Sequence, residues 1–373
     1  MVRTALVHDW LNGMRGGEKV LEVFCDIFPD ADIYTLFYEP GAVSDKINKH
    51  NPVPSFLQKF PLVKNHYRWL LPLFPAAVKR FDLSGYDLVI SISHCAAKGV
   101  KVPREKTHVC YCLTPMRYVW DKYEDYFGRR AKWSPARIAM SILRGPLQHW
   151  DVKTATGVDF FIATSEFIRK RIKKYYGEES IIIHPPVDVE FFHPARNQEE
   201  KPADSGDQYY LLASALVPYK RVDIAIEAFR KRRDNLIVVG SGPERENLEK
   251  SASSNIQFCG WVSNESLREI YRGARALIFP PEEDFGIIPL EASACGCPVI
   301  AYDAGGARET VIHGKTGLLF PEQTPESLNE ALSEFNPRDF ETGVMVKHAR
   351  KFSREECKKK LKRYFTDKAG DLC

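Results

Sequence analysis

Short apolar runs alternate with helical stretches along the chain, and this alternation limits the folds open to it. In the first half, the predicted strands are RTALVHD, ADIYTLF, YDLVISIS, THVCYCL, DFFIATS and SIIIHPP. Amphipathic runs such as GGEKVLEVFCDIF lie between them, and a long helix is predicted over 135–156. Strands that alternate with helices build parallel sheets from βαβ units, so the predicted fold class is α/β.

The alternation is interrupted once, which predicts two domains. Residues 193–208 are polar and rich in turn formers, and strands and helices resume at YYLLASAL. We predict a first domain over 1–195, a linker over 196–208 and a second domain over 209–340. Helices over 341–373 are expected to pack back on the first domain. Two doubly wound domains would face each other across a cleft at the carboxyl ends of their strands, where ligands bind.

Composition excludes several classes of protein. The net charge is only +4 and no block of lysine and arginine stands out, so no nucleic-acid partner is expected. Nine cysteines without a secretory signal indicate a reducing, cytoplasmic location. The pairs Cys110/Cys112 and Cys295/Cys297 do not have the spacing of common zinc sites, and we interpret the cysteines as core residues.

Residues 59–80 mix aromatic and basic side chains. No apolar run reaches the roughly 18 residues of a spanning helix, but this mixture suits the headgroup layer of an anionic bilayer. The segment predicts peripheral contact with the inner face of the cytoplasmic membrane; the alternative is a helix that packs its apolar side on the domain. The residues concerned are Phe60, Tyr67, Trp69, Leu70, Leu73 and Phe74, with Lys59, Lys64, Arg68, Lys79 and Arg80.

Two loops that follow strands carry features of an anion site. Gly16 and Gly17, in MRGGEKV, let the backbone approach a ligand closely and begin a helix whose N–H groups attract anions. A simple tight turn is the alternative. Lys220 and Arg221, in SALVPYKRVD, suit a diphosphate, although exposed cations at a helix start would look the same.

A third glycine-containing loop, VVGSGPERENLE, superficially matches a dinucleotide fingerprint. Gly240 and Gly242 follow a strand, but Arg245 stands where the third glycine would be. The segment is also far from the first strand of a domain. A nicotinamide site is therefore not predicted.

Two glutamates frame the stretch EEDFGIIPLE. Glu283 lies on the loop that leaves the buried strand ALIFP, and Glu291 lies inside a helix that is predicted to begin near Gly286. The backbone N–H groups of Phe285, Gly286 and Ile287 would lie between the two carboxylates. Carboxylates that accept from hydroxyls, beside amides that donate to phosphate, suit a sugar nucleotide; two solvated glutamates are the alternative.

With these residues in view, the chain resembles the retaining glycosyltransferases of family 4, most closely from Val217 to Phe320. The resemblance implies the GT-B fold of two Rossmann-like domains and rests mainly on the E-x7-E motif from Glu283 to Glu291. It implies that Glu283 binds donor-sugar hydroxyls, Glu291 the ribose and Lys220 the diphosphate. The residues expected to bind the donor are Gly16, Gly17, Lys220, Arg221, Phe285, Gly286, Ile287 and Glu291.

The first domain resembles bacterial mannosyltransferases that use GDP-mannose and build O-antigen and other surface polysaccharides. Two positions depart from that pattern: Leu113 replaces a histidine before TPMR, and Ala215 replaces an arginine. His94 is then the nearest candidate for a polar role beside the sugar, with a core histidine as the alternative. We assign Glu283, His94 and Lys220 as catalytic and Arg117 as an acceptor contact.

The expected activity is transfer of a hexose, mannose from GDP-mannose, to a lipid-linked saccharide or another saccharide, with retention at the anomeric carbon. No metal is expected, because Lys220, Arg221 and backbone amides offer the positive charge. A sugar-nucleotide epimerase of the same fold and a non-catalytic nucleotide-sugar-binding subunit are the alternatives.

Overall fold

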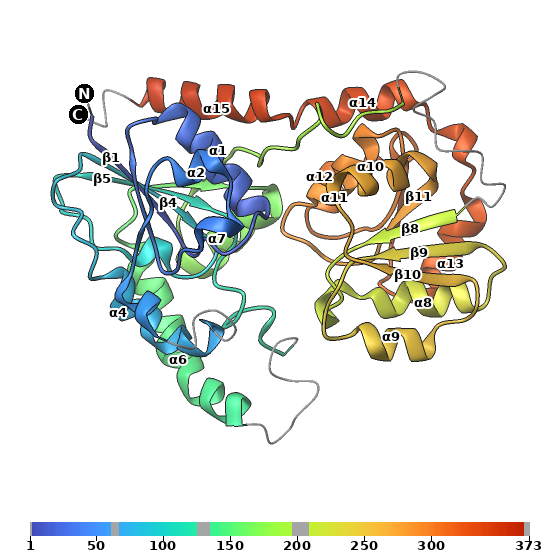
Figure 1. The fold of residues 1–373 in the computed structure, drawn as a ribbon, viewed down its shortest axis with the longest axis horizontal. Coiled ribbons are helices and arrows are strands. Elements are labelled where there is room, and N and C mark those ends of the chain that lie inside the picture. The colour runs from blue at the N-terminus through green and yellow to red at the C-terminus, as the bar shows by residue number, and fades with distance from the viewer. Residues whose placement is uncertain (1, 61–66, 125–134, 196–208, 369–373) are drawn as a thin grey trace. The chain divides into compact units, whose positions relative to one another are not determined.

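The computed structural model describes residues 2–60, 67–124, 135–195 and 209–368. The chain divides into two compact units (Figure 1), Met1–Pro186 with Cys357–Cys373, and Val187–Glu356. The predicted linker, 196–208, lies outside the described residues. The sequence prediction assigned 187–195 to the first domain, but these residues group with the second unit, where the Val187 N–H donates to the Phe352 carbonyl at 2.8 Å.

The first unit contains a seven-stranded parallel sheet in the order β3-β2-β1-β4-β5-β6-β7. Its strands are β1 (Thr4–His8), β2 (Asp32–Thr35), β3 (Val53–Pro54), β4 (Leu88–Ser93), β5 (Thr107–Cys112), β6 (Phe160–Ala163) and β7 (Ser180–Ile182). Its helices are α1 (Gly16–Ile27), α2 (Asp45–Asn48), α4 (Phe74–Val78), α6 (Pro135–Ala155) and α7 (Glu166–Tyr176), with short η1 (Pro40–Ala42), η2 (Phe56–Lys59), η3 (Tyr67–Leu73) and η4 (Ala97–Gly99). The sequence missed β3, because a two-residue strand has no periodicity and its proline is tolerated only at a sheet edge.

Successive residues of the central strands enter opposite layers of the first unit. Ala5 and Val7 of β1 join one hydrophobic cluster, and Leu6 joins the cluster on the other face. All five residues of β1 are buried. A parallel sheet covered on both faces explains why the predicted strands read as continuous apolar runs rather than as alternating ones.

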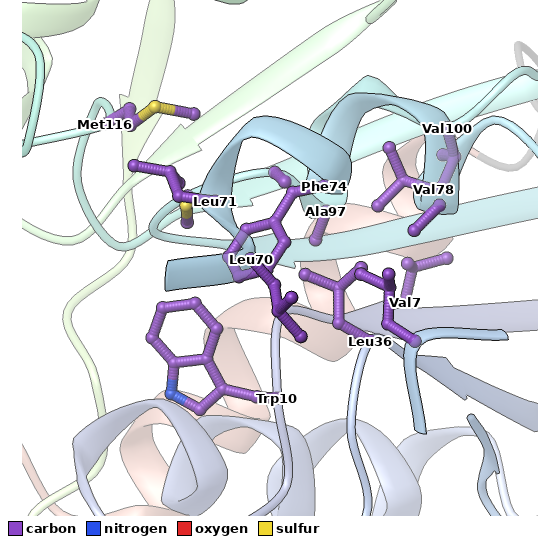
Figure 2. Close-up of a cluster of buried hydrophobic side chains, with 14 of the residues drawn as sticks. Val7, Trp10, Leu36, Leu70, Leu71, Phe74, Val78, Ala97, Val100 and Met116 are labelled. Atoms are coloured by element: carbon purple, nitrogen blue, oxygen red, sulfur yellow. The ribbon is translucent and has the colours of Figure 1, made fainter. Parts of the chain in front are cut away.

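The inner side of the segment 59–80 belongs to this core. Leu70, Leu71 and Phe74, on η3 and α4, are buried in the cluster that contains Val7 and Trp10 (Figure 2). The packing of these three side chains agrees with the helix interpretation of the segment. Lys64 lies outside the described residues, so its part in the predicted membrane contact is not described.

The second unit contains a six-stranded parallel sheet in the order β10-β9-β8-β11-β12-β13. Its strands are β8 (Tyr209–Ala213), β9 (Asn235–Val239), β10 (Ile256–Gly260), β11 (Ala274–Phe279), β12 (Val299–Tyr302) and β13 (Gly317–Phe320). Its helices are α8 (Val222–Arg230), α9 (Arg245–Ser251), α10 (Asn264–Gly273), α11 (Ile287–Ala294), α12 (Ala307–Thr310), α13 (Pro325–Glu334) and α14 (Thr342–Arg350), with short η5 (Pro218–Lys220) and η6 (Pro337–Asp339). Both sheets are Rossmann-like, as the sequence predicted.

The last helix, α15 (Arg354–Asp367), carries an apolar stripe on one face. Cys357, Leu361 and Phe365 are four residues apart, so they lie on one side of the helix, and all three are buried. The ring of Phe365 lies 6.2 Å from that of Phe24 and 5.2 Å from that of Phe28, both from the α1 region of the first unit. In the described part of the chain, no helix combines the length and apolarity needed to cross a membrane.

Candidate active site

Strand order in the second sheet identifies where a site can form. β8 and β11 are neighbours, and the chain runs outward from them in opposite directions, through β9 to β10 and through β12 to β13. The loops that leave β8 and β11 therefore separate, and such a switch point opens a crevice at the carboxyl edge of a sheet. The first loop carries Lys220 and the second carries Glu283.

Lys220 and Glu283 form an ion pair across this switch point. The Lys220 Nζ lies 2.5 Å from the Glu283 Oε1, and the two side chains are 15% and 17% exposed. The pair places an ammonium, which attracts phosphate, beside a carboxylate, which accepts hydrogen bonds from hydroxyls. The structure thus brings together two of the three residues predicted to be catalytic.

The guanidinium of Arg221 is bound by residues other than Lys220 and Glu283. Its Nε and Nη2 donate to the Asp223 carboxylate at 3.2 Å, and its Nη1 donates to the Gln323 side chain at 3.1 Å. Gln323 in turn donates to the carbonyl of Pro280, at the start of the loop that carries Glu283. Arg221 therefore links the two loops, while its predicted contact with phosphate stays a prediction.

A pair of glycines after β12 holds the backbone of Glu283. The Gly306 N–H donates to the Glu283 carbonyl at 2.8 Å. A Cβ on Gly306 would lie 2.1 Å from the Phe285 carbonyl oxygen, and one on Gly305, whose φ is +58°, would lie 2.3 Å from the Glu283 carbonyl oxygen. Only glycine permits these two loops to approach so closely.

Helix α11 begins at Ile287, directly after Gly286, which has a φ of +97° and lies at the predicted helix start. Glu291 is the fifth residue of the helix and is 6% exposed, so it is not the solvated glutamate of the alternative interpretation. Burial raises the pKa of the neighbouring Tyr271 hydroxyl, and the charge of Glu291 adds to this shift. Phe285 is also buried and packs on Phe352 at 5.7 Å between ring centroids.

Gly240 and Gly242 have a packing role that agrees with the rejection of a nicotinamide site. Cβ atoms on them would lie 1.8 Å from the Ser214 carbonyl oxygen and 2.3 Å from that of Leu216. The Leu216 N–H donates to the Ser241 carbonyl at 2.9 Å. The loop after β9 thus supports the loop after β8, in which Ala215 is exposed.

The first sheet has its own switch point, between β1 and β4. Asp9 follows β1 and is fully buried, and His94 follows β4. The His94 Nδ1 lies 3.1 Å from the Asp9 Oδ2, and the imidazole is 22% exposed. His94 is therefore bound at a strand end next to a carboxylate and is not sealed in the core.

Gly17 lies against protein rather than against open space. A Cβ on it would lie 2.9 Å from the Leu113 Cδ1 and 3.1 Å from the His8 Nε2. Both Gly16 and Gly17 belong to the first turn of α1. Close packing of α1 therefore explains Gly17 on its own, and the predicted ligand contact of the two glycines stays a prediction.

Two titratable groups near this helix start have strongly shifted pKa values. Burial, followed by the charge of His94, lowers the pKa of His8 to about 4, so His8 is neutral at pH 7. Burial raises the pKa of Glu18 to about 7. The Glu18 carboxylate accepts from the Arg15 N–H at 3.0 Å and caps α1.

Arg117 lies in a turn after β5 and is partly buried. Nearby in the sequence, Thr114 accepts a hydrogen bond from Arg171 at 2.8 Å, and Arg171 pairs with Asp121 at 2.7 Å. Arg171 lies on α7, so these contacts hold the turn after β5 against that helix. The acceptor contact of Arg117 stays a prediction.

The sequence interpretation missed Asp9, His8, Glu18 and the glycine pair Gly305 and Gly306. A signal existed for the first two, since HD closes the first predicted strand and polar residues at the carboxyl end of a parallel strand lie at the binding edge. Among the described residues, no cluster of three or more His, Cys, Asp or Glu side chains is arranged to hold a metal ion. The expected metal independence stays a prediction.

Comparison with known proteins relates part of this chain to glycosyltransferases. Residues 195–352 match the family described as "Glycosyl transferases group 1". A "GDP-mannose-dependent alpha-(1-6)-phosphatidylinositol monomannoside mannosyltransferase" of Mycobacterium tuberculosis is 32% identical over 231 residues, which cover 56% of this chain and 58% of that protein. A "GDP-mannose-dependent monoacylated alpha-(1-6)-phosphatidylinositol monomannoside mannosyltransferase" of Corynebacterium glutamicum is 33% identical over 221 residues, which cover 53% of this chain and 58% of that protein. The chain thus spans less than two thirds of these relatives.

The fold is that of solved glycosyltransferases with two Rossmann-like parallel sheets, the GT-B fold. The structure of Anabaena Alr3699/HepE in complex with UDP and glucose matches with a TM-score of 0.68 and 17% identity, and covers 98% of this chain and 100% of that one. The comparisons favour neither the epimerase nor the non-catalytic subunit.

Proposed function

We propose that this chain is a retaining glycosyltransferase that transfers mannose from GDP-mannose to a hydroxyl of a lipid-linked saccharide or another saccharide. The observation that carries the proposal is the pair of Lys220 and Glu283 at the switch point of the second sheet. Similarity to GDP-mannose-dependent proteins supports the donor. The assembly of surface polysaccharides, O-antigen included, is the process that we propose it serves.

In this proposal, Lys220 binds the diphosphate and stabilises the charge that builds on it as the bond to the anomeric carbon breaks. Glu283 accepts hydrogen bonds from sugar hydroxyls, and Glu291 accepts from the ribose. Phe285, Gly286 and Ile287 donate backbone N–H groups to the donor. The acceptor oxygen bonds to the anomeric carbon on the face that the diphosphate leaves, and its proton passes to the departing diphosphate. No metal takes part.

The test is calorimetric titration with GDP, UDP, ADP and CMP, followed by product analysis with GDP-mannose. We expect GDP to bind most tightly. Lys220→Ala should weaken the binding of GDP by 10-fold or more, since a hydrogen bond to a charged group contributes about 1.5–3 kcal/mol. Glu283→Ala should abolish transfer while the protein stays folded. Lys347→Ala, a change at an exposed lysine on α14, is the matched control. Preference for UDP would overturn the mannose donor, and normal turnover by Glu283→Ala would overturn the site. Turnover that EDTA abolishes would overturn metal independence.

We further propose that the outer side of residues 59–80 contacts an anionic membrane, at the inner face of the cytoplasmic membrane. Trp69 is 72% exposed, Phe60 and Leu73 of the same segment are also exposed, and the exposed cations Lys79 and Arg80 follow α4. Exposed apolar side chains and cations in one segment fit an anionic headgroup layer.

Vesicles that contain anionic phosphatidylglycerol should bind the protein in low salt and release it in high salt. Trp69→Ser combined with Lys79→Ser and Arg80→Ser should abolish this binding. Trp261→Ser, at a tryptophan of the second unit that is 78% exposed, is the control and should change nothing. Equal binding by the triple variant would show that another surface is responsible.

A further inference from the structure

Asp9 receives an unusual number of donors for a buried carboxylate. Its Oδ2 accepts from the N–H groups of His94 and Cys95 at 2.7 and 2.9 Å, and its Oδ1 accepts from those of Ala96 and Ala97 at 2.6 and 2.8 Å. The His94 Nδ1 adds a fifth contact at 3.1 Å. Asp9 is separated from these residues by 85 or more positions in the chain, so only the pairing of β1 with β4 brings them together.

The donors fix the ionisation state of Asp9. Burial is the largest effect and raises the pKa of Asp9 above its ordinary value, and the N–H groups of His94, Ala96 and Ala97 oppose this shift. Backbone amides are obligate donors and occupy both carboxylate oxygens, so a proton on either oxygen would face an N–H rather than an acceptor. Asp9 is therefore an ionised carboxylate that can only accept.

An acceptor-only neighbour favours one tautomer of His94. The His94 Nδ1 lies 3.1 Å from the Asp9 Oδ2. A nitrogen lone pair this close to a carboxylate oxygen would be repelled, so a proton on Nδ1 is favoured, and Nε2 then carries the lone pair when the ring is neutral. The plane of the His94 ring is held as well, because the Trp10 ring packs against it in a T-shaped arrangement, with 4.3 Å between ring centroids and 87° between ring planes. Trp10 is itself anchored in the core cluster of Figure 2, 5.1 Å from the ring of Tyr67.

We propose that Asp9 is a positioning residue that holds His94 in the Nδ1–H tautomer, with Nε2 presented as a hydrogen-bond acceptor to a sugar hydroxyl. The proposal deepens the proposed function and rests on it for the identity of the ligand. The partly exposed imidazole is the group that touches the sugar, and the buried Asp9 acts only through it. If Asp9 only anchored the loop after β4, its four backbone N–H donors would be sufficient, and the orientation of the His94 ring would not depend on it.

The first test reads the tautomer directly. In protein labelled with ¹⁵N-histidine, long-range proton–nitrogen correlation spectra report which ring nitrogen carries the proton, and His94→Ala identifies the His94 signals. We expect the Nδ1–H form in the unaltered protein and the Nε2–H form in Asp9→Asn, whose side-chain amide can donate to Nδ1. Asp159→Asn is the matched control, since Asp159 accepts the backbone N–H of another histidine, His108, at 2.8 Å, while the ring nitrogens of His108 have the Ser91 hydroxyl and the Gly157 carbonyl as partners. An Nε2–H form of His94 in the unaltered protein would overturn the proposal, even if Asp9→Asn failed to fold.

The second test uses kinetics with GDP-mannose. Asp9→Asn should lower kcat/KM by about 10-fold, as expected for one hydrogen bond to a neutral group, and the loss should fall on KM. In the His94→Ala background, Asp9→Asn should cause no further loss. An equal loss in both backgrounds would show that Asp9 acts through the loop and not through His94. Absence of transfer in all variants, with the tautomers as expected, would refute the proposed function and leave the pairing of Asp9 with His94 intact.

Discussion

Gly306→Ala tests whether close loop packing positions Glu283. The added Cβ would lie 2.1 Å from the Phe285 carbonyl oxygen, whereas real Cβ contacts do not fall below 3.0 Å. The φ of Gly306 is −71°, so alanine meets no backbone strain and the clash acts alone. Since the obstacle is backbone, one loop must move by about 1 Å, and overpacking of this kind costs about 1–3 kcal/mol.

The same displacement should reach the site, because the Gly306 N–H donates to the Glu283 carbonyl. A shift of about 1 Å in a binding group can cost about 100-fold in kcat/KM. We expect a lower urea midpoint for Gly306→Ala and weaker binding of nucleotide sugar in calorimetric titration.

Gly343→Ala is the matched control in the same unit. Gly343 lies in α14, and its nearest neighbour to an added Cβ is a side-chain oxygen of Glu341 at 3.5 Å. Alanine favours a helix over glycine by up to about 1 kcal/mol, so this variant should be at least as stable as the unaltered protein. A Gly306→Ala variant with an unchanged midpoint and unchanged affinity would refute the reasoning.

Three further predictions concern the first unit. Glu18 has its pKa raised by burial, so the folded state retains a proton that the unfolded state loses, and stability should fall as pH rises from about 4.5 to about 7; urea unfolding of Glu18→Gln should show a flatter pH profile in this window. Lys98→Met should lower the free energy of unfolding by about 3–5 kcal/mol, because it leaves the carboxylate of Asp151, now 2.8 Å from the ammonium and fully buried, without its cation; Lys101→Met, at an exposed lysine, should leave the urea midpoint unchanged. Gly17→Ala should lower the free energy of unfolding by about 1–2 kcal/mol, because the added Cβ meets Leu113. In a Leu113→Ala background, Gly17→Ala should lower the stability by less, as measured by thermal unfolding. An equal loss of stability in both backgrounds would exclude the contact.

The sequence by itself determined most of the strands, the longer helices such as α1 and α6, and the presence of two parallel sheets, although it missed β3. These features depend on local signals: apolar runs of strand length, amphipathic helical periods, and glycines at helix starts such as Gly286. It also predicted Lys220 and Glu283 as site residues, because each follows a strand on the edge where parallel sheets bind ligands.

Only the tertiary structure decided which of these residues meet. The pairing of Lys220 with Glu283 depends on β8 and β11 being neighbours, and that of Asp9 with His94 depends on β1 lying beside β4. Strand order is set by packing between distant segments and leaves no periodic trace in the chain. For the same reason, the sequence did not show that Gly306 is required by a carbonyl oxygen of another loop, since a steric limit exists only once both loops are in place.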